Sequence, residues 1–179
     1  GQRYADLSDL QCGAALLNDC KYGYRVKGSV LDLALLRSTK YPDWFADQGK
    51  HRFTYSFLPH DRTLAESGVM QDAAVLNRAP ILADGFTAGS AAAPCRIDSD
   101  GISLEVVKRA EKDDSIILRL VETRGKFSCG TLDFASRPEK VTETDLMEWG
   151  DGPALKLKGK TLALEMKPFE IRTLRVRNR

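Results

Sequence analysis

The chain has 179 residues, 42% of them hydrophobic and 29% charged, and its 27 basic and 25 acidic side chains leave a net charge of +2. This is enough material for one sizeable hydrophobic core or two small ones. The near balance of charge argues against a nucleic-acid partner, and no run approaches the ~18 consecutive apolar residues that a membrane span needs. The chain starts with Gly1 and a strand-like pattern is under way by Asp6, so we interpret it as a piece of a longer protein.

The first sixty residues follow a period of two, which is typical of β-strands. We predict strands over residues 14–17, 30–37 and 51–58. In the last of them Phe53, Tyr55 and Phe57 alternate, so they should share one face of a half-buried strand. Turn-forming residues lie between the predicted strands, namely Gly23, Gly28, Pro42 and Gly49.

One segment has helical spacing instead. Thr63 and Glu66 fit a capping box, in which each side chain satisfies a backbone N–H of the first turn. Apolar residues then recur at helical intervals until Pro80, which stops a helix. The pattern predicts a short helix over residues 64–76, weakened by Gly68.

A stretch of small residues, TAGSAAAP at 87–94, is the best linker candidate. We therefore expect two domains, residues 1–90 and residues 95–179. Beyond the linker, alternating apolar residues predict strands near 102–106, 116–120, 127–134, 141–148, 155–157, 161–166 and 169–176.

Turns every 8–12 residues in this second half predict an antiparallel sandwich. The apolar phase slips between Ile171 and Leu174, and a bulge near Thr173 would absorb that slip. The acidic residues Glu143, Asp145 and Glu148 are interpreted as a solvated strand edge. The fold class that we predict is mainly β, with one short helix.

The cysteines and histidines offer no metal site within the chain. Cys12, Cys20, Cys95 and Cys129 lack the C-x2-C spacing of zinc sites, which predicts free, mostly buried thiols in a cytoplasmic protein. The two histidines, His51 and His60, have no acidic residue at ligand spacing and no adjacent serine. We interpret both histidines as structural hydrogen-bonding residues.

Two polar-aromatic segments are the candidate binding sites. The run Asn18 to Tyr24 combines an amide, a carboxylate, an ammonium and two tyrosines, which could hold a sugar through its hydroxyls and its C–H face. The same residues are also typical of an ordinary turn, in which Asn18 or Asp19 bonds its own backbone and the tyrosines are half-buried. Trp44 and Phe45 could form a second platform or pin their own loop, and Arg37 could hold a ligand or pair with an aspartate. None of the 25 acids is assigned by the sequence to a catalytic pair such as glycosidases use.

Several motifs carry a resemblance to a known family. They are ADLS (5–8), LLNDCKYGY (16–24), VKG (26–28), LLRS (35–38), KYPD (40–43), ADQG-x-H-x-F-x-Y (46–55) and PH (59–60). This run resembles the C-terminal region of α-mannosidases, a family of retaining glycoside hydrolases, and is most similar to the cytosolic, vacuolar and bacterial branch. The closing PFEIRTLRV (168–176) is similar to that family's C-terminal strand.

The resemblance implies that catalysis belongs to another part of the protein, which this chain does not include. In the family, an N-terminal barrel holds a divalent metal, usually zinc, with two His and two Asp, and one of those Asp residues is the nucleophile. The resemblance therefore implies no catalytic residue, no metal ligand and no cofactor in this chain. It also implies that residues 1–90 are the later part of a large β-sandwich and residues 95–179 a smaller terminal sandwich.

The resemblance further implies a contribution to the rim of the substrate cleft. Some members bring a loop and an arginine there, and the matching positions are Asn18, Asp19, Lys21, Tyr22, Tyr24 and Arg37. The chain departs from the branch pattern at Thr39, at Trp44-Phe45 and at Lys50 and Arg52. The implied partners are the catalytic barrel and a mannose-containing oligosaccharide, and a second copy of the chain is a further candidate.

Two hypotheses follow. In the first, the chain is the C-terminal β portion of an α-mannosidase, a scaffold and cleft rim that is inactive alone. In the second, it is a free-standing carbohydrate-binding or interaction module, with Tyr22, Tyr24 and Trp44 as its platform.

Overall fold

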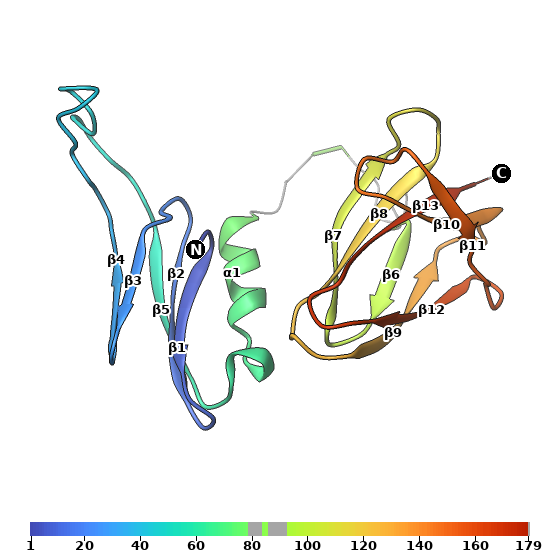
Figure 1. Cartoon of the computed structure of the whole chain (residues 1–179), viewed down its shortest axis with the longest axis horizontal. Coiled ribbons are helices and arrows are strands. Elements are labelled where there is room, and N and C mark those ends of the chain that lie inside the picture. Colours follow the sequence, from blue (N-terminus) through green and yellow to red (C-terminus); the bar gives the residue numbers. More distant parts are fainter. Residues whose placement is uncertain (79–83, 86–92, 179) are drawn as a thin grey trace. The chain divides into compact units, whose positions relative to one another are not determined.

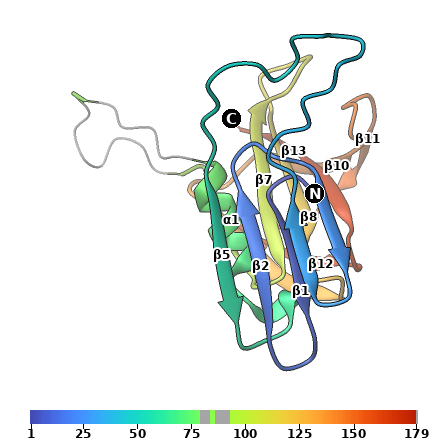
Figure 2. The ribbon, with the colours of Figure 1, turned by 90° about the vertical axis from the view of Figure 1, so that its left-hand side faces the viewer.

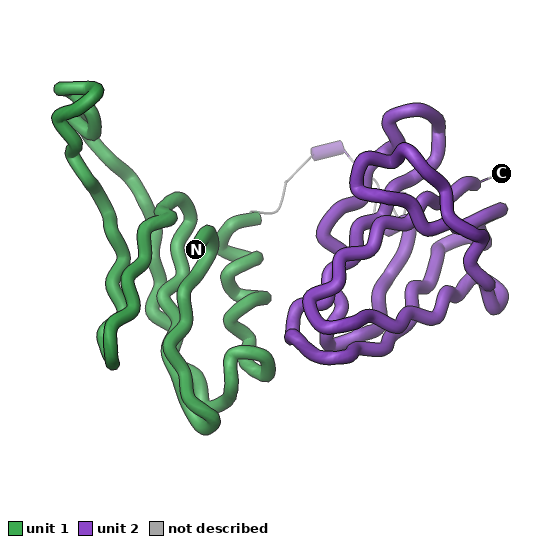
Figure 3. The backbone as a smooth tube through the Cα atoms, viewed as in Figure 1, with its two compact units in different colours: residues 1–83 green, residues 84–179 purple. Residues whose placement is uncertain are grey.

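The computed structural model describes residues 1–78, 84–85 and 93–178 of the chain. These residues form two compact units, residues 1–83 and residues 84–179, which Figure 3 distinguishes by colour. Residues 87–92 of the predicted linker lie outside the described residues. The helices of the described part are too short and too polar to cross a membrane.

The centre of unit 1 is a three-stranded antiparallel sheet in the order β1-β2-β5, formed by β1 (Tyr4–Ser8), β2 (Gly13–Asn18) and β5 (Tyr55–His60). The turn between β1 and β2 is closed by Asp9, whose Oδ1 accepts hydrogen bonds from the N–H groups of Gln11 (2.7 Å) and Cys12 (2.8 Å). This is the Asx-turn chemistry that favours aspartate at such positions.

The predicted helix is broken into two pieces, η1 (Leu64–Glu66) and α1 (Val69–Asn77). The Thr63 hydroxyl donates to the Glu66 carboxylate (3.1 Å) and caps no backbone N–H, so the capping box does not form. Ser67 has an extended backbone and Gly68 precedes α1 as its N-cap. The prediction of one continuous helix is therefore wrong at Ser67 and Gly68.

Helix α1 covers one face of the sheet and builds the small core of unit 1. Val69 and Ala73 of α1 pack with Ala15 and Leu17 of β2, and all four are fully or almost fully buried. Figure 1 shows the hairpin of β3 (Tyr24–Lys27) and β4 (Val30–Leu33) on the other side of the sheet from α1.

Two strand predictions in unit 1 need correction. The strand predicted over residues 30–37 ends at Leu33, because the chain then leaves the hairpin as a long projecting segment, residues 34–54 (Figures 1 and 2). The strand predicted over residues 51–58 starts at Tyr55 and continues to His60. Tyr55 and Phe57 are 58% and 68% exposed, so the aromatic face expected to be half-buried is uncovered.

Unit 2 is an antiparallel sandwich of a five-stranded sheet, β11-β10-β13-β8-β7, and a three-stranded sheet, β12-β9-β6. The strands are β6 (Cys95–Asp98), β7 (Ile102–Arg109), β8 (Ile116–Glu122), β9 (Ser128–Phe134), β10 (Lys140–Thr144), β11 (Asp151–Ala154), β12 (Thr161–Met166) and β13 (Ile171–Arg177). The prediction of a mainly β, antiparallel fold with one short α-helix is confirmed.

Alternating side chains of the two sheets fill the core between them. Leu118, Leu120 and Leu174 contribute from the large sheet, and Leu132 and Leu164 from the small one. All five are at most 1% exposed. This is the period-two pattern that the sequence shows in this half.

The bulge predicted near Thr173 is absent from β13. This strand pairs in unbroken register with β8 and β10, and Leu174 and Val176 face the core. Phe169 and Ile171 are 72% and 53% exposed, so the apparent phase slip only marks apolar residues that lie outside the core. Register shifts occur instead in β7 and β10.

The solvated acidic edge predicted at Glu143, Asp145 and Glu148 is wrong for Glu143 and Glu148, and only Asp145 is exposed. Strand β10 lies between β11 and β13, and Glu143 accepts hydrogen bonds from the Arg172 guanidinium (2.8 and 3.2 Å). Glu148 is only 4% exposed. The segment predicted at 155–157 is not a strand, although Leu155 and Leu157 pack against the core.

The four cysteines are free thiols, as predicted, but only Cys95 is buried. The expectation of mostly buried thiols is wrong for Cys12, Cys20 and Cys129, which are exposed.

Candidate functional site

Asn18 organises the loop that follows β2. Its side chain is fully buried, and its Oδ1 accepts hydrogen bonds from the N–H groups of Cys20 (3.0 Å) and Lys21. Its Nδ2 donates to the hydroxyl of Tyr24 at the start of β3. The Asn77 side chain of α1 donates to the Asn18 carbonyl (2.9 Å). Asn18 is therefore committed to folding the loop, in agreement with the turn interpretation.

Asp19 ties the same loop to the segment that enters β5. Its N–H donates to the Thr54 carbonyl (3.2 Å), and its Oδ1 accepts from the Thr54 N–H (3.0 Å). The Cys20 thiol and the Thr54 N–H lower the pKa of Asp19, which stays a carboxylate. The same contact with Asp19 raises the pKa of the Cys20 thiol.

Lys21 and Tyr22 present the accessible groups of the loop. The Lys21 ammonium lies 4.8 Å from the centroid of the Phe53 ring, a cation–π distance. Tyr22 is 65% exposed. Tyr24 is half-buried, and its hydroxyl donates to the Leu16 carbonyl (3.3 Å). Of the two tyrosines that the sequence proposes, Tyr22 alone has a largely free ring.

The projecting segment, residues 34–54, is called the arm below. Its two sides are joined by Asp47, whose Oδ2 accepts hydrogen bonds from the N–H groups of Ser38 (2.8 Å) and Arg37 (3.3 Å). These contacts lower the pKa of Asp47, with Ser38 the larger cause. The Asp47 carbonyl also lies 2.9 Å from Nε2 of His51. Asp47 has a left-handed backbone, φ +60°, which aspartate tolerates better than most residues.

The tip of the arm exposes aromatic rings. Asp43 stabilises its turn by accepting from the Phe45 N–H (2.9 Å). Tyr41, Trp44 and Phe45 are 87%, 70% and 73% exposed. Trp44 and Phe45 therefore do not pin the loop to its own unit, which contradicts one of the two sequence-based interpretations.

The Arg37 guanidinium is exposed at the arm. Of its two expected partners, Asp32 pairs with Arg25 (2.6 Å) and Asp43 holds the turn described above. No carboxylate of the residues described here forms an ion pair with Arg37. The guanidinium is free to bind an external oxygen.

The loop and the base of the arm thus form one surface, joined by the Asp19–Thr54 and Lys21–Phe53 contacts. Asn18, Asp19 and Tyr24 build it, whereas Lys21, Tyr22 and Arg37 keep accessible polar groups. Sequence reasoning missed Phe53 and Thr54 as site residues, because each contacts a loop that is distant along the chain. It missed Asp47 because the contacts of this residue depend on how the two sides of the arm come together.

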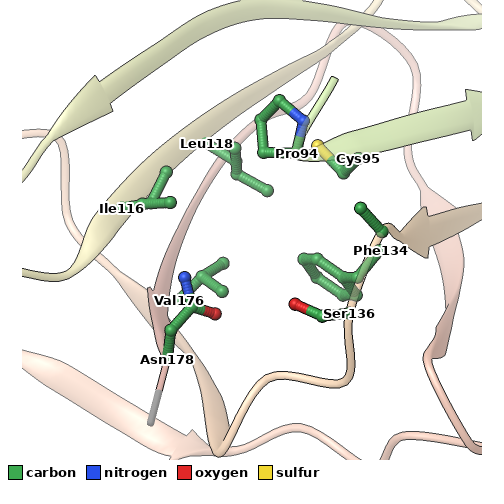
Figure 4. Close-up of a pocket in the computed structure, with 9 residues that line it drawn as sticks. Pro94, Cys95, Ile116, Leu118, Phe134, Ser136, Val176 and Asn178 are labelled. Atoms are coloured by element: carbon green, nitrogen blue, oxygen red, sulfur yellow. The ribbon is translucent and has the colours of Figure 1, made fainter. Parts of the chain in front are cut away.

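No metal centre is evident in the described part of the chain. Its His, Cys, Asp and Glu side chains form no group of three or more that could hold a metal. At one end of the unit 2 sandwich a pocket of about 80 Å³ is lined mainly by apolar side chains (Figure 4). Burial raises the pKa of the Cys95 thiol in its wall. This volume is well below the ~300 Å³ of small ligand sites. A wider hollow of about 600 Å³ beside it is lined by Arg96, Asp133 and Lys160 and is open to solvent.

Two family models match the chain. "Glycosyl hydrolases family 38 C-terminal domain" matches residues 1–45, and "Glycosyl hydrolases family 38 C-terminal beta sandwich domain" matches residues 101–174. The first match contains the loop and half of the arm, and the second contains most of the unit 2 sandwich.

Curated relatives match almost the whole chain. Alpha-mannosidase 2C1 of Mus musculus is 38% identical over 179 residues, covering 96% of this chain and 17% of that protein. Alpha-mannosidase G of Dictyostelium discoideum is 34% identical over 186 residues, covering 98% of this chain and 17% of that protein. The chain thus spans 17% of the length of these relatives.

Solved structures share the fold. A glycosyl hydrolase family 38 protein from Enterococcus faecalis superposes with a TM-score of 0.72 at 21% identity, over 97% of this chain and 22% of that one. An alpha-mannosidase from Enterococcus faecalis V583 gives the same TM-score at 19% identity.

Proposed function

Since the chain belongs to glycosyl hydrolase family 38, whose two C-terminal domains it carries, we propose that it is the C-terminal β portion of an α-mannosidase. The parent enzyme would hydrolyse terminal α-mannosidic bonds with retention. The observation that carries the proposal is the 38% identity to an alpha-mannosidase along 96% of the chain. Within that enzyme the chain is a scaffold and a rim of the substrate cleft, and catalysis belongs to the N-terminal barrel.

The two units correspond, in this proposal, to two sandwich domains, residues 1–90 and 95–179. Unit 1 is the later part of a larger sandwich. This assignment is supported by the face of the β1-β2-β5 sheet that α1 does not cover. There Leu16, Leu33 and Tyr55 line an open groove between the sheet and the β3–β4 hairpin. A two-stranded hairpin is marginal by itself and is expected to continue into further strands.

The metal of the parent enzyme is assigned to its catalytic domain. Family 38 α-mannosidases depend on a metal in general. The donor groups of the described residues do not fit one, since no three of them converge and His60 is engaged by Asp6 and Arg62. We propose zinc as that metal, bound outside this chain.

The candidate rim consists of Lys21, Tyr22 and Arg37, held by Asn18, Asp19 and Tyr24. A guanidinium and an ammonium without a fixed carboxylate partner can hydrogen-bond sugar hydroxyls, and Tyr22 offers a ring for the C–H face. A mannose-containing oligosaccharide is the partner that this chemistry fits.

The first test compares the native polypeptide that contains this chain with the 179-residue chain alone. We expect α-mannosidase activity from the former and none from the latter, even with added zinc or cobalt. Robust turnover by the isolated chain would contradict the scaffold role. A native polypeptide without α-mannosidase activity would contradict the enzyme assignment.

The rim is tested by Arg37→Ala in the native polypeptide. Losing a charged hydrogen bond to substrate should lower kcat/KM by about 10- to 100-fold, since such bonds contribute about 1.5–3 kcal/mol. The control is Arg25→Ala, because Arg25 is an exposed arginine paired with Asp32 on the neighbouring hairpin. Equal kcat/KM values for both variants and the wild type would show that Arg37 is not part of the rim.

The second candidate function is a free-standing carbohydrate-binding module, favoured by the exposed rings of Tyr22 and Trp44. Titration of the chain with mannose and manno-oligosaccharides, followed by tryptophan fluorescence, tests it. A fluorescence change that saturates at millimolar or lower sugar concentration, and that is lost in Trp44→Ala, would support the module. No fluorescence change would favour the scaffold role.

We propose the cytoplasm as the compartment. Cys12, Cys20 and Cys129 are exposed and unpaired, which fits a reducing environment.

A further inference from the structure

The loop between β10 and β11 exposes three large apolar side chains. Leu146, Met147 and Trp149 are 56%, 61% and 72% exposed, and they are called the apolar knuckle below. Trp and Met are enriched at protein interfaces, where Trp is also a frequent energetic anchor.

Polar contacts fix the backbone of this loop. Asp145 accepts hydrogen bonds from the Glu148 N–H (3.1 Å) and the Trp149 N–H (3.0 Å). The Leu146 carbonyl accepts from the Arg119 guanidinium (3.3 Å), and the Gly150 carbonyl accepts from the Thr144 hydroxyl. These hydrogen bonds hold the backbone of the knuckle in one conformation.

Glu148 lies in the middle of the knuckle but points the opposite way, into unit 2. Its carboxylate is buried and accepts from the Glu111 N–H (2.9 Å) and pairs with the Lys108 ammonium (2.9 Å). Arg175 donates to its carbonyl (2.8 Å). The Glu111 N–H and then Lys108 lower the pKa of this carboxylate, so it is held as an anion.

This arrangement costs stability. Glu148 has φ +61°, a left-handed conformation that glutamate rarely adopts, so its backbone is strained. A residue with a strained backbone thus lies among three exposed apolar side chains. Strained backbone of this kind tends to be retained where a surface has a task.

The size of the knuckle indicates what covers it. The surface of one six-residue loop, residues 145–150, is far smaller than the ~800 Å² per partner of a stable interface between free molecules. A contact within one polypeptide needs less area, because tethering gives a high effective concentration. The relatives supply such a tethered partner, since 83% of their length lies outside the part that this chain matches (100% − 17%).

We propose that the apolar knuckle docks on an apolar surface of the catalytic part of the same polypeptide. The inference rests on the proposed function, because it needs a larger enzyme around the chain. Its partner surface is apolar, since the side chains that the knuckle presents to solvent are Leu146, Met147 and Trp149.

Oxidative footprinting tests the docking, because Met147 and Trp149 are among the side chains most reactive to hydroxyl radicals. We expect both to be labelled in the 179-residue chain and protected in the native polypeptide. Met166, which is fully buried in the core of unit 2, is the folding control and should stay unlabelled in both. Equal labelling of Met147 in both forms overturns the proposal, and so does protection that disappears when a dimer is diluted.

A pair of variants separates docking from a local effect. Trp149→Ser should restore the labelling of Met147 in the native polypeptide and lower its melting temperature, while leaving that of the 179-residue chain unchanged. Phe127→Ser, at an aromatic residue of unit 2 that is 59% exposed, should not restore Met147 labelling. If Phe127→Ser acts like Trp149→Ser, the docking is not specific to the knuckle. Protection of Met147 in a polypeptide without α-mannosidase activity would reject the proposed function and leave the docking intact.

Discussion

His60 shows how one side chain joins three segments of unit 1. Its Nε2 donates to the Asp6 carboxylate (2.8 Å), and its Nδ1 donates to the Arg62 carbonyl (2.6 Å). The side chains of His60 and Asp6 are 8% and 4% exposed. Both partners are acceptors, so the geometry fits the imidazolium, and the hydrogen bond to Asp6 is the main cause of the raised pKa of His60.

This contact predicts a pH-dependent stability. Because the pKa of His60 is higher in the folded than in the unfolded chain, the stabilisation is present in full below the unfolded value, about 6.5, and is lost as the pH rises through the folded value. We expect the free energy of unfolding to fall over that range, measured by urea denaturation at a series of pH values. His60→Gln should remove this slope, whereas variant His51→Gln, which keeps the His60–Asp6 contact, should retain it. A slope that survives in His60→Gln would assign it to another group.

At the residue scale the candidate site was only partly predictable. The sequence identifies Asn18 to Tyr24 as an unusual cluster, but it cannot say that Asn18 is fully buried while Tyr22 is exposed. Those differences depend on Tyr24 and Asn77, which reach Asn18 from separate elements. The role of Glu122 was not predicted for the same reason. Its buried carboxylate accepts hydrogen bonds from the nearby Arg124 N–H and from the N–H of Phe169, which lies 47 residues further along the chain.

At the element scale, local pattern was a good guide inside unit 2 and a weaker one in unit 1. Strands β8, β9 and β12 are found where the alternation predicts them, because both sheets bury one face. Strand β5 has the predicted alternation, yet its aromatic face is exposed. The short strand β6 gave too little periodicity to be assigned, and β1 was indicated only by the strand-like pattern around Asp6.

The arm has no regular secondary structure, and its two sides are held together by Asp47. Asp47→Ala removes the acceptor for the Arg37 and Ser38 N–H groups, so we expect these amides to exchange faster with deuterium. Asp47→Asn is the matched control, because its side-chain oxygen can accept the same bonds and asparagine tolerates positive φ. Amide exchange measured by NMR or mass spectrometry decides between them. Unchanged protection in Asp47→Ala would show that the arm is held by other contacts.

At the scale of the whole chain, the two units differ in how completely they bury their apolar residues. In the described part of the chain, the buried cluster of unit 1 contains Ala15, Leu17, Val69 and Ala73, and two of these are alanines. The cluster of unit 2 is three times as large and lies between two sheets. Unit 2 therefore has a core of the kind found in independent domains, whereas the small core of unit 1 fits our proposal that it is part of a larger sandwich.

The uncovered face of unit 1 predicts self-association of the isolated chain. Strand β5 is an edge strand, Tyr55 and Phe57 are exposed on it, and an exposed apolar edge is a template for pairing with another copy. We expect dimers or larger species whose population rises with concentration, measured by light scattering. Phe57→Ser should reduce the association without lowering the melting temperature, because the side chain is 68% exposed in the monomer.

Val75→Ser is the control, since Val75 is 72% exposed on α1, which covers the opposite face of the sheet. In the native polypeptide the rest of the sandwich would cover Phe57, so there the same substitution should destabilise the protein. A chain that stays monomeric at high concentration would argue that this face tolerates water and needs no further strands.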